Sequence, residues 1–193
     1  MTDGWERVRD RVAARTDRII EGIQAEWGTD RTGEPFELGP RPFDPDEPPE
    51  TAGAQLDRIA GVASVVVYYT EAREETVLVF NPGGYWEPPG GVVERDQTPA
   101  EAARTEAREE IGVDVALTDV HYTTRCQFQY AAGHSVPLPV VQFVGHRTGG
   151  SLHVERERLD HPGVTRATGV FDADVFPEPC RDGDEIRALL ASE

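Results

Sequence analysis

The segment GGVVERDQTPAEAARTEAREEIGV, residues 90–113, contains the clearest structural signal in the chain. Two glycines lead into a short charged loop. Thr98 is a favourable N-cap, Pro99 suits the first helical position, and Glu101 completes a capping box with Thr98. A glycine after the last apolar residue then ends the pattern. The spacing predicts a helix over residues 99–111.

Three glutamates share one side of this predicted helix. At about 100° per residue, Glu106, Glu109 and Glu110 fall within an arc of roughly 100°. Ala102 lies on the same side and leaves it open, and a neighbouring apolar stripe is expected to pack against a sheet. That stripe consists of Ala103, Ala107 and Ile111, whereas Arg104 and Arg108 point toward water.

The glutamate cluster has two interpretations. On a very acidic protein it is one more patch of solvated charge, although like charges three and four residues apart destabilise a helix by roughly a few tenths of a kcal/mol. A bound divalent cation reverses that penalty. Carboxylate oxygens suit Mg²⁺ or Mn²⁺ better than Zn²⁺, for which this segment offers no His or Cys.

The segment also resembles the Nudix box, the signature motif of the Nudix hydrolase family. That motif has a glycine, five residues, a glutamate, seven residues, and then Arg-Glu-apolar-x-Glu-Glu-x-Gly-apolar. Gly91 opens the motif in this chain, and the later matches are Glu106, Ala107, Glu109, Glu110, Gly112 and Val113. Further matches to common family usage are Gly90, Glu94, Thr98 and Pro99.

The resemblance implies a fold and an activity. The expected fold is an α/β (α+β) Nudix α/β/α sandwich with a mixed β-sheet over residues 61–193, preceded by an N-terminal helical extension over residues 1–60. The expected activity is hydrolysis of a nucleoside diphosphate linked to another moiety, with water attacking phosphorus and Mg²⁺ or Mn²⁺ as the cofactor. By analogy with the family, the metal ligands are the Gly91 carbonyl and the side chains of Glu106, Glu109 and Glu110.

Two positions depart from the family motif. Gln97 stands where a glutamate is expected, and Thr105 stands where an arginine is expected. In the family these two residues are associated with an ion pair that orients a metal-binding glutamate, and a Gln97–Thr105 hydrogen bond would replace it here. A surface ion pair contributes only ~0–1 kcal/mol, so the exchange is compatible with activity. The alternative is a Nudix-fold nucleotide-binding or regulatory module with weak or no catalysis.

The general base is expected in a loop well after the motif, by analogy with several Nudix enzymes. In the segment HVERERLDHPG the candidates are Glu155, Glu157 and Asp160, with solvated loop charge as the alternative for each. Glu157 and Asp160 are the predicted catalytic residues of this loop. His161 titrates in a useful range, although a His-Pro pair in a loop is commonly structural.

Three aromatic residues are candidates for contacting the substrate. Tyr85, Trp86 and Tyr130 have rings that stack on a nucleotide base, with core packing as the alternative role. By its spacing from the motif, Tyr130 is similar to a tyrosine of Nudix enzymes that cleave diadenosine polyphosphates. The predicted partner is therefore a nucleotide-like small molecule.

The composition sets the chemical context. The 193 residues include 36 Asp and Glu against 19 arginines and no lysine, for a net charge of −17. This balance resembles that of proteins from extreme halophiles and predicts a cytoplasmic protein in a salty cell. It argues against broad nucleic-acid binding, which requires a basic face. The sequence has neither a signal-peptide pattern nor an apolar run of ~18 residues, so we expect no membrane association.

Periodicity predicts a long N-terminal helix over residues 4–27. Its apolar positions are Trp5, Val8, Val12, Ile19, Ile23 and Trp27. This stripe is expected to pack on the body of the protein, with a homodimer contact as the alternative. Residues 29–50 are rich in proline and acids and predict an extended connector, followed by a short helix over residues 51–60.

The rest of the chain predicts strands and a final helix. The runs SVVVYY and TVLVF indicate a hairpin within residues 63–80. Longer strands are expected over residues 114–130 and 136–146, then a short strand that ends near Phe171, and an amphipathic helix in RDGDEIRALLASE. Two cysteines without motif spacing, Cys126 and Cys180, are expected to pack as small apolar residues without a disulfide.

Overall fold

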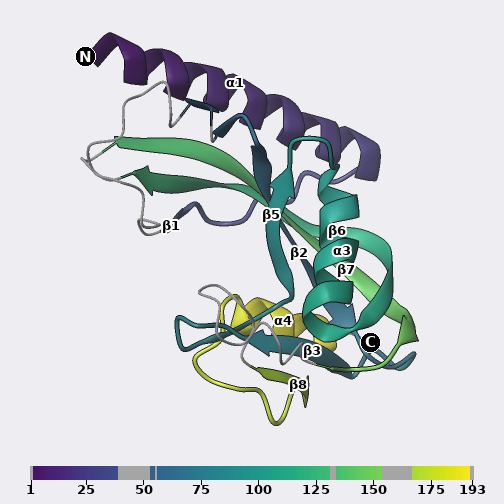
Figure 1. Ribbon diagram of the computed structural model, residues 1–193. Coiled ribbons are helices and arrows are strands. Elements are labelled where there is room, and N and C mark those ends of the chain that lie inside the picture. The colour runs from purple at the N-terminus through teal and green to yellow at the C-terminus, as the bar shows by residue number, and fades with distance from the viewer. Residues whose placement is uncertain (1, 39–52, 55, 131–133, 154–166, 192–193) are drawn as a thin grey trace. The chain divides into compact units, whose positions relative to one another are not determined.

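The computed structural model describes residues 2–38, 53–54, 56–130, 134–153 and 167–191 (Figure 1). In those residues the helices are α1 (Thr2–Trp27), α3 (Pro99–Ile111) and α4 (Gly183–Leu190). The strands are β1 (Phe36–Leu38), β2 (Ile59–Tyr68), β3 (Glu75–Phe80), β4 (Trp86–Glu87), β5 (Gly90–Glu94), β6 (Val113–Tyr130), β7 (His134–Gly150) and β8 (Ala167–Asp172). The three helices confirm those predicted from periodicity and capping.

The strands form a mixed sheet. Hydrogen bonds give the strand order β1-β6-β7-β2-β3-β4, with β5 paired to β2 and β8 paired to β3. β1 runs parallel to β6, whereas β3 is antiparallel to β2, β4 and β8. The predicted α+β class and the predicted hairpin are therefore confirmed.

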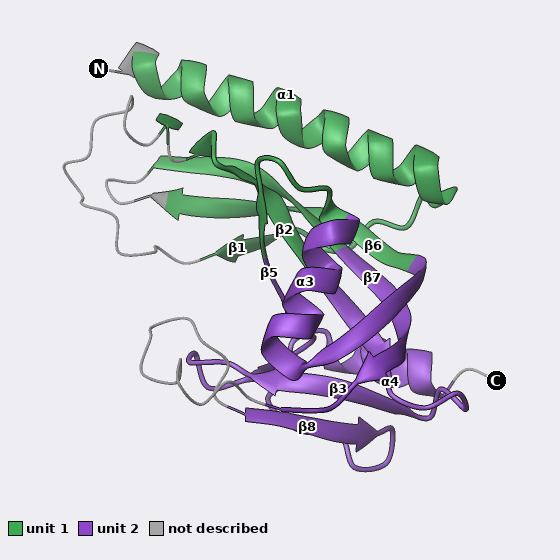
Figure 2. Ribbon diagram, turned by 45° about the vertical axis from the view of Figure 1, so that its right-hand side comes forward, with its two compact units in different colours: residues 1–63, 92–99, 120–141 green, residues 64–91, 100–119, 142–193 purple. Residues whose placement is uncertain are grey.

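The chain forms two compact units (Figure 2). Unit 1 contains residues 1–63, 92–99 and 120–141, and unit 2 contains residues 64–91, 100–119 and 142–193. Strands β2, β5, β6 and β7 each contribute residues to both units. The division of the chain into residues 1–60 and 61–193 stays a prediction.

The apolar stripe of α1 packs inside unit 1. Val8 and Val12 share a buried cluster with Leu56, Cys126, Phe128, Val136, Leu138 and Val140. Thr16 is fully buried on the same helix, and its hydroxyl donates to the carbonyl of Pro137 at 2.8 Å. Packing on the body of the protein is thus confirmed for this stripe, with Ile20 buried where Ile19 was predicted.

Two apolar clusters lie among the described residues of unit 2. In the first, Val66, Leu78 and Ile186 are buried, with Trp86 and Phe171 packed against them. In the second, Tyr68, Val144 and Leu190 are buried. Ile186 and Leu190 lie one turn apart on α4, so this short helix is held by both clusters.

Two predictions for the segment before β2 are corrected. The predicted helix over residues 51–60 is wrong at its end, because β2 already begins at Ile59; residues 53, 54 and 56 are helical. The predicted connector contains β1, whose three residues pair with Cys126, Gln127 and Phe128 of β6. A parallel partner far along the chain leaves no local sequence pattern, so this strand was missed.

The faces of α3 follow the helical wheel. The predicted stripe is buried, and Arg104 and Arg108 are exposed. Ala102, on the glutamate side, is also buried, at 1% exposed. Burial on this side fixes the rotation of α3 about its axis, and with it the direction of the glutamates.

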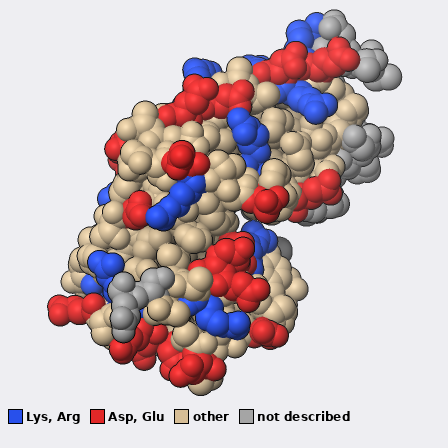
Figure 3. All heavy atoms as spheres, turned by 180° about the vertical axis from the view of Figure 1, so that it is seen from behind, with Lys and Arg blue, Asp and Glu red and all other residues tan. Residues whose placement is uncertain are grey.

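On the face in Figure 3, the acidic side chains and the arginines of the described residues are interspersed. Both cysteines are free, as predicted. Burial, together with the charges of Asp182 and Glu87, raises the pKa of the Cys180 thiol to about 12. No helix in the described ranges is long and apolar enough to cross a membrane.

Gly112 should tolerate substitution poorly. Its φ of +74° is left-handed, and a Cβ there would overlap the His153 ring and lie 2.5 Å from the carbonyl oxygen of Ser151. Gly112→Ala is therefore expected to lower the free energy of unfolding by about 2 kcal/mol, from strain and overlap together. Urea denaturation measures this change.

Gly84→Ala is the matched control for that substitution. Gly84 has a φ of +86°, but a Cβ there would meet nothing within 4 Å. Gly84→Ala therefore introduces backbone strain without overlap, and we expect it to lower the free energy of unfolding by about 1 kcal/mol. Equal losses in the two variants would show that the overlap with His153 and Ser151 contributes nothing.

Candidate functional site

Two of the predicted metal-site glutamates contact the glycines that begin β5. The Gly90 N–H donates to Glu110 Oε2 at 2.9 Å. A Cβ on Gly91 would lie 2.6 Å from Cδ of Glu106 and even closer to its Oε1, so the Glu106 carboxylate lies directly against the Gly91 backbone. We call these four residues the glycine–glutamate site; all of them belong to unit 2.

The local sequence explains this arrangement. Glu106 and Glu110 are one helical turn apart, so their side chains project from the same side of α3. The buried alanines and Ile111 fix the rotation of α3 about its own axis. At position 91 only glycine leaves room for the Glu106 carboxylate. This steric requirement explains the second glycine of the pair.

The donor set matches the chemistry of a hard divalent cation. Carboxylate oxygens and a backbone carbonyl are the ligands that Mg²⁺ and Mn²⁺ prefer. Within the part of the chain that the structure describes, however, no three His, Cys, Asp or Glu side chains stand close enough to hold a metal ion. The structure brings Glu106 and Glu110 to the glycines, whereas Glu109 is exposed on α3 and is not gathered with them.

Gln97 forms a turn with Glu94. Its side-chain oxygen accepts from the Glu94 N–H at 3.3 Å, and its backbone N–H donates to the Glu94 carbonyl at 3.1 Å. The neutral residue therefore supports the loop between β5 and α3. Thr105 is exposed on α3, and the Gln97–Thr105 hydrogen bond stays a prediction.

The aromatic candidates next to the glycines are engaged in packing. Trp86 contacts Phe80 and Phe171, with ring centroids 5.3 and 4.9 Å apart. The Tyr85 hydroxyl accepts from Arg181 Nη2 at 2.6 Å, and the same guanidinium lies 5.1 Å from the centre of the Tyr85 ring. For Trp86, core packing is thus the role that the structure supports.

The predicted general bases lie outside the described residues. These are Glu155, Glu157 and Asp160, together with His161. The side chain of Tyr130 also lies outside what the structure describes. Their catalytic and binding roles stay predictions.

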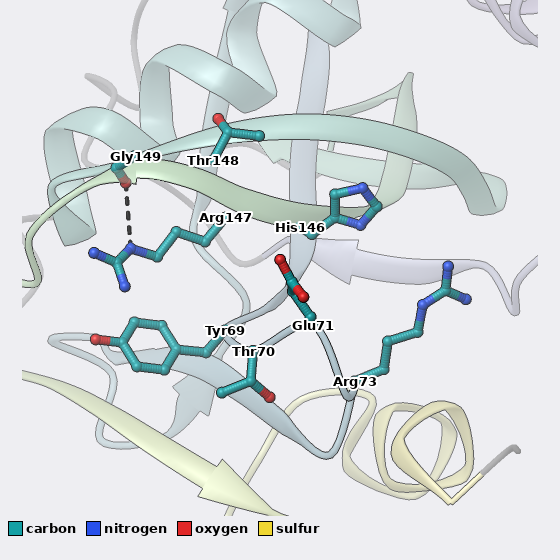
Figure 4. Close-up of a pocket in the computed structure, with 8 residues that line it drawn as sticks. All are labelled: Tyr69, Thr70, Glu71, Arg73, His146, Arg147, Thr148 and Gly149. Atoms are coloured by element: carbon teal, nitrogen blue, oxygen red, sulfur yellow. Dashed lines mark hydrogen bonds between the residues drawn. The ribbon is translucent and has the colours of Figure 1, made fainter.

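Unit 2 also has a cavity that sequence reasoning missed (Figure 4). Its volume is about 580 Å³, and its lining residues are Tyr69, Thr70, Glu71, Arg73, His146, Arg147, Thr148 and Gly149. Arg147 lies 5.0 Å from the centre of the Tyr69 ring and donates to the carbonyls of Gly149 and Gly150. The Arg147 guanidinium is thus already hydrogen-bonded to neighbouring backbone carbonyls, which indicates a structural role for that arginine.

Comparisons with known proteins agree with the motif. The model of the NUDIX domain matches residues 60–178. An 8-oxo-dGTP diphosphatase of Proteus vulgaris is 40% identical over 55 residues, which is 28% of this chain but only 42% of that protein.

Two solved structures have a similar fold. A MutT Nudix hydrolase from Burkholderia pseudomallei has 18% identity and a TM-score of 0.50, covering 68% of this chain and 96% of that one. A Nudix family hydrolase from Clostridium perfringens has 14% identity and a TM-score of 0.51, covering 67% and 94%. Because the domain match extends over more than half of the residues and includes the glycine–glutamate site, the chain belongs to the NUDIX domain family.

Proposed function

We propose that this chain hydrolyses the diphosphate bond of a nucleoside diphosphate linked to another moiety. The observation that carries the proposal is the contact of Glu106 and Glu110 with the Gly90–Gly91 backbone. Family membership and the diphosphatase named for the Proteus relative support the same reaction class. Glu109 and the Gly91 carbonyl complete the proposed set of ligands for Mg²⁺ or Mn²⁺.

The protein groups have separate tasks in this proposal. The Gly90 N–H donates to Oε2 of Glu110 and so fixes the position of that carboxylate. The missing side chain of Gly91 lets the Glu106 carboxylate approach the backbone at that position. A divalent cation held by these residues would supply positive charge against the diphosphate and would make water more acidic. Glu157 or Asp160 would accept the proton of the attacking water.

A nucleotide-binding or regulatory module is the second candidate function. It is favoured by the neutral Gln97 and Thr105, and by the absence of a three-carboxylate cluster among the described residues. Both candidates place a nucleotide at the glycine–glutamate site. They differ in whether the diphosphate bond is broken.

A panel of nucleoside diphosphate derivatives distinguishes the two candidates. Each compound is incubated with Mg²⁺ or Mn²⁺ in molar KCl, and its products are separated by ion-exchange chromatography. The enzyme hypothesis predicts turnover of at least one compound by the wild type and its loss in Glu109→Gln. Tight binding of a compound without turnover would favour the module instead. Glu185→Gln, an exposed acid on α4, is the control for charge.

The cellular setting is part of the proposal. The net charge of −17 supports a protein from a salty cytoplasm. A homodimer through α1 also stays a prediction, and the packing of Val8 and Val12 inside unit 1 leaves less apolar surface for it. Sedimentation velocity in molar KCl measures the oligomeric state.

A further inference from the structure

Unit 1 has a cavity whose wall consists mainly of arginines. Its volume is about 360 Å³, and its lining residues are Arg11, Val12, Arg15, Arg18, Asp57, Ala60 and Arg95. Among the described residues, the lining therefore has four arginines and one acid, Asp57. In a chain where acids outnumber arginines 36 to 19, this local excess of positive charge is the reverse of the overall balance.

Segments far apart in the sequence build this arginine cavity. Arg11, Arg15 and Arg18 follow one another at spacings of four and three, so they share one face of α1. Arg95 comes from the loop after β5, and its backbone N–H donates to the Arg58 carbonyl at 3.0 Å. The fold thus adds a fourth cation to a stripe of three.

The described residues satisfy the hydrogen-bonding groups of these arginines only in part. Arg11 lies 3.2 Å from Asp57, and Arg15 Nη2 donates to the Leu56 carbonyl at 2.9 Å. The Nε of Arg15 is buried with no hydrogen-bond partner among the described residues. Among the residues that the structure describes, Arg18 donates only to the Ala14 carbonyl of its own helix. In the described ranges neither Arg18 nor Arg95 forms an ion pair with an acid.

The cations are close enough to repel one another. Burial lowers the pKa of the Arg15 guanidinium, Asp57 raises it, and Arg11, Arg18 and Arg95 each lower it. In the described part of the chain, Asp57 is the one acid that counters this repulsion at Arg15. A buried donor without a partner also costs free energy that an anionic ligand would recover.

We propose that the arginine cavity binds a small phosphate-bearing anion. Guanidinium groups match phosphate oxygens with paired N–H donors, and such charge-assisted bonds are among the strongest hydrogen bonds in proteins. The volume is at the small end of the range for ligand sites, which suits a phosphate or diphosphate group better than a whole dinucleotide. The site shares no residue with the glycine–glutamate site, so the inference does not depend on the proposed hydrolysis.

Calorimetric titration with inorganic pyrophosphate, in buffer with EDTA, tests the proposal. The chelator removes divalent cations, so the glycine–glutamate site cannot take up the anion through a metal. The wild type is compared with Arg18→Gln/Arg95→Gln, which removes two charges that lack an ion-pair partner in the described structure. Arg104→Gln/Arg125→Gln removes the same charge from exposed positions outside the cavity. Thermal unfolding checks that every variant is folded.

The wild type is expected to bind pyrophosphate, and the cavity variant to bind it at least about tenfold more weakly. The control variant should stay within about twofold of the wild type. Absence of binding in the wild type, or equal weakening in both variants, overturns the proposal. Titration with ADP distinguishes the sources: binding as tight as that of pyrophosphate assigns the site to nucleotide phosphates, and weaker binding assigns it to the inorganic anion. Glu109→Gln should bind like the wild type even if hydrolysis fails.

Discussion

Glu106→Gln is expected to lower kcat by about 10²–10³-fold. The substitution keeps the size of the side chain but removes the charge that lies against Gly91. Metal-assisted stabilisation of a transition state contributes several kcal/mol, and about 1.4 kcal/mol corresponds to tenfold in rate. Steady-state kinetics with the best compound of the panel, at saturating Mg²⁺, measures the loss.

Glu185→Gln is the matched control for this prediction. It makes the same chemical change on exposed α4 and should leave kcat within about twofold. Thermal unfolding should place both variants near the wild type, because neither substitution removes a buried apolar group. If Glu106→Gln kept the wild-type kcat, its carboxylate would have no part in the reaction.

Gly91→Ala is expected to reduce activity by about 10²-fold with little loss of stability. The new Cβ would lie 2.6 Å from Glu106 Cδ, so one group has to move. The carboxylate is the end of a flexible side chain and moves more easily than the backbone. A displacement of about 1 Å at a reacting centre is enough to cost about 10²-fold in rate. The kcat and the unfolding midpoint of this variant are measured together.

Two further variants show whether the overlap causes the effect. Gly22→Ala places a Cβ in open space on α1 and should leave activity unchanged. The double variant Gly91→Ala/Glu106→Gln should be no less active than Glu106→Gln alone, because the displaced group has already lost its function. Fully additive losses would mean that the two residues act independently.

The helices were predictable because their signals are local. The apolar stripe of α1 and the capped start of α3 each lie within a few turns, and both helices begin and end within about two residues of the predicted positions. β1 was missed because its pairing with β6 joins Phe36 to Cys126. A parallel pairing over that separation leaves no trace in the Pro-rich connector.

The same distinction applies to the sites. The shared side of Glu106 and Glu110 follows from helical geometry, so the sequence predicted it. The burial of Ala102 and the bond from Gly90 to Glu110 depend on packing and appear only in the structure. The arginine cavity could not be predicted from local patterns, because several strands lie in the sequence between the three arginines of α1 and Arg95.

Hydrolysis in ¹⁸O-labelled water tests the central claim most directly. Phosphorus NMR detects the isotope shift of the phosphate that receives the solvent oxygen, for the wild type and for Glu106→Gln/Glu110→Gln. The proposed function predicts labelled phosphate product from the wild type and almost none from the double variant in the same time. Unlabelled phosphate products, or labelled product formed equally fast by the double variant, would contradict hydrolysis at the glycine–glutamate site.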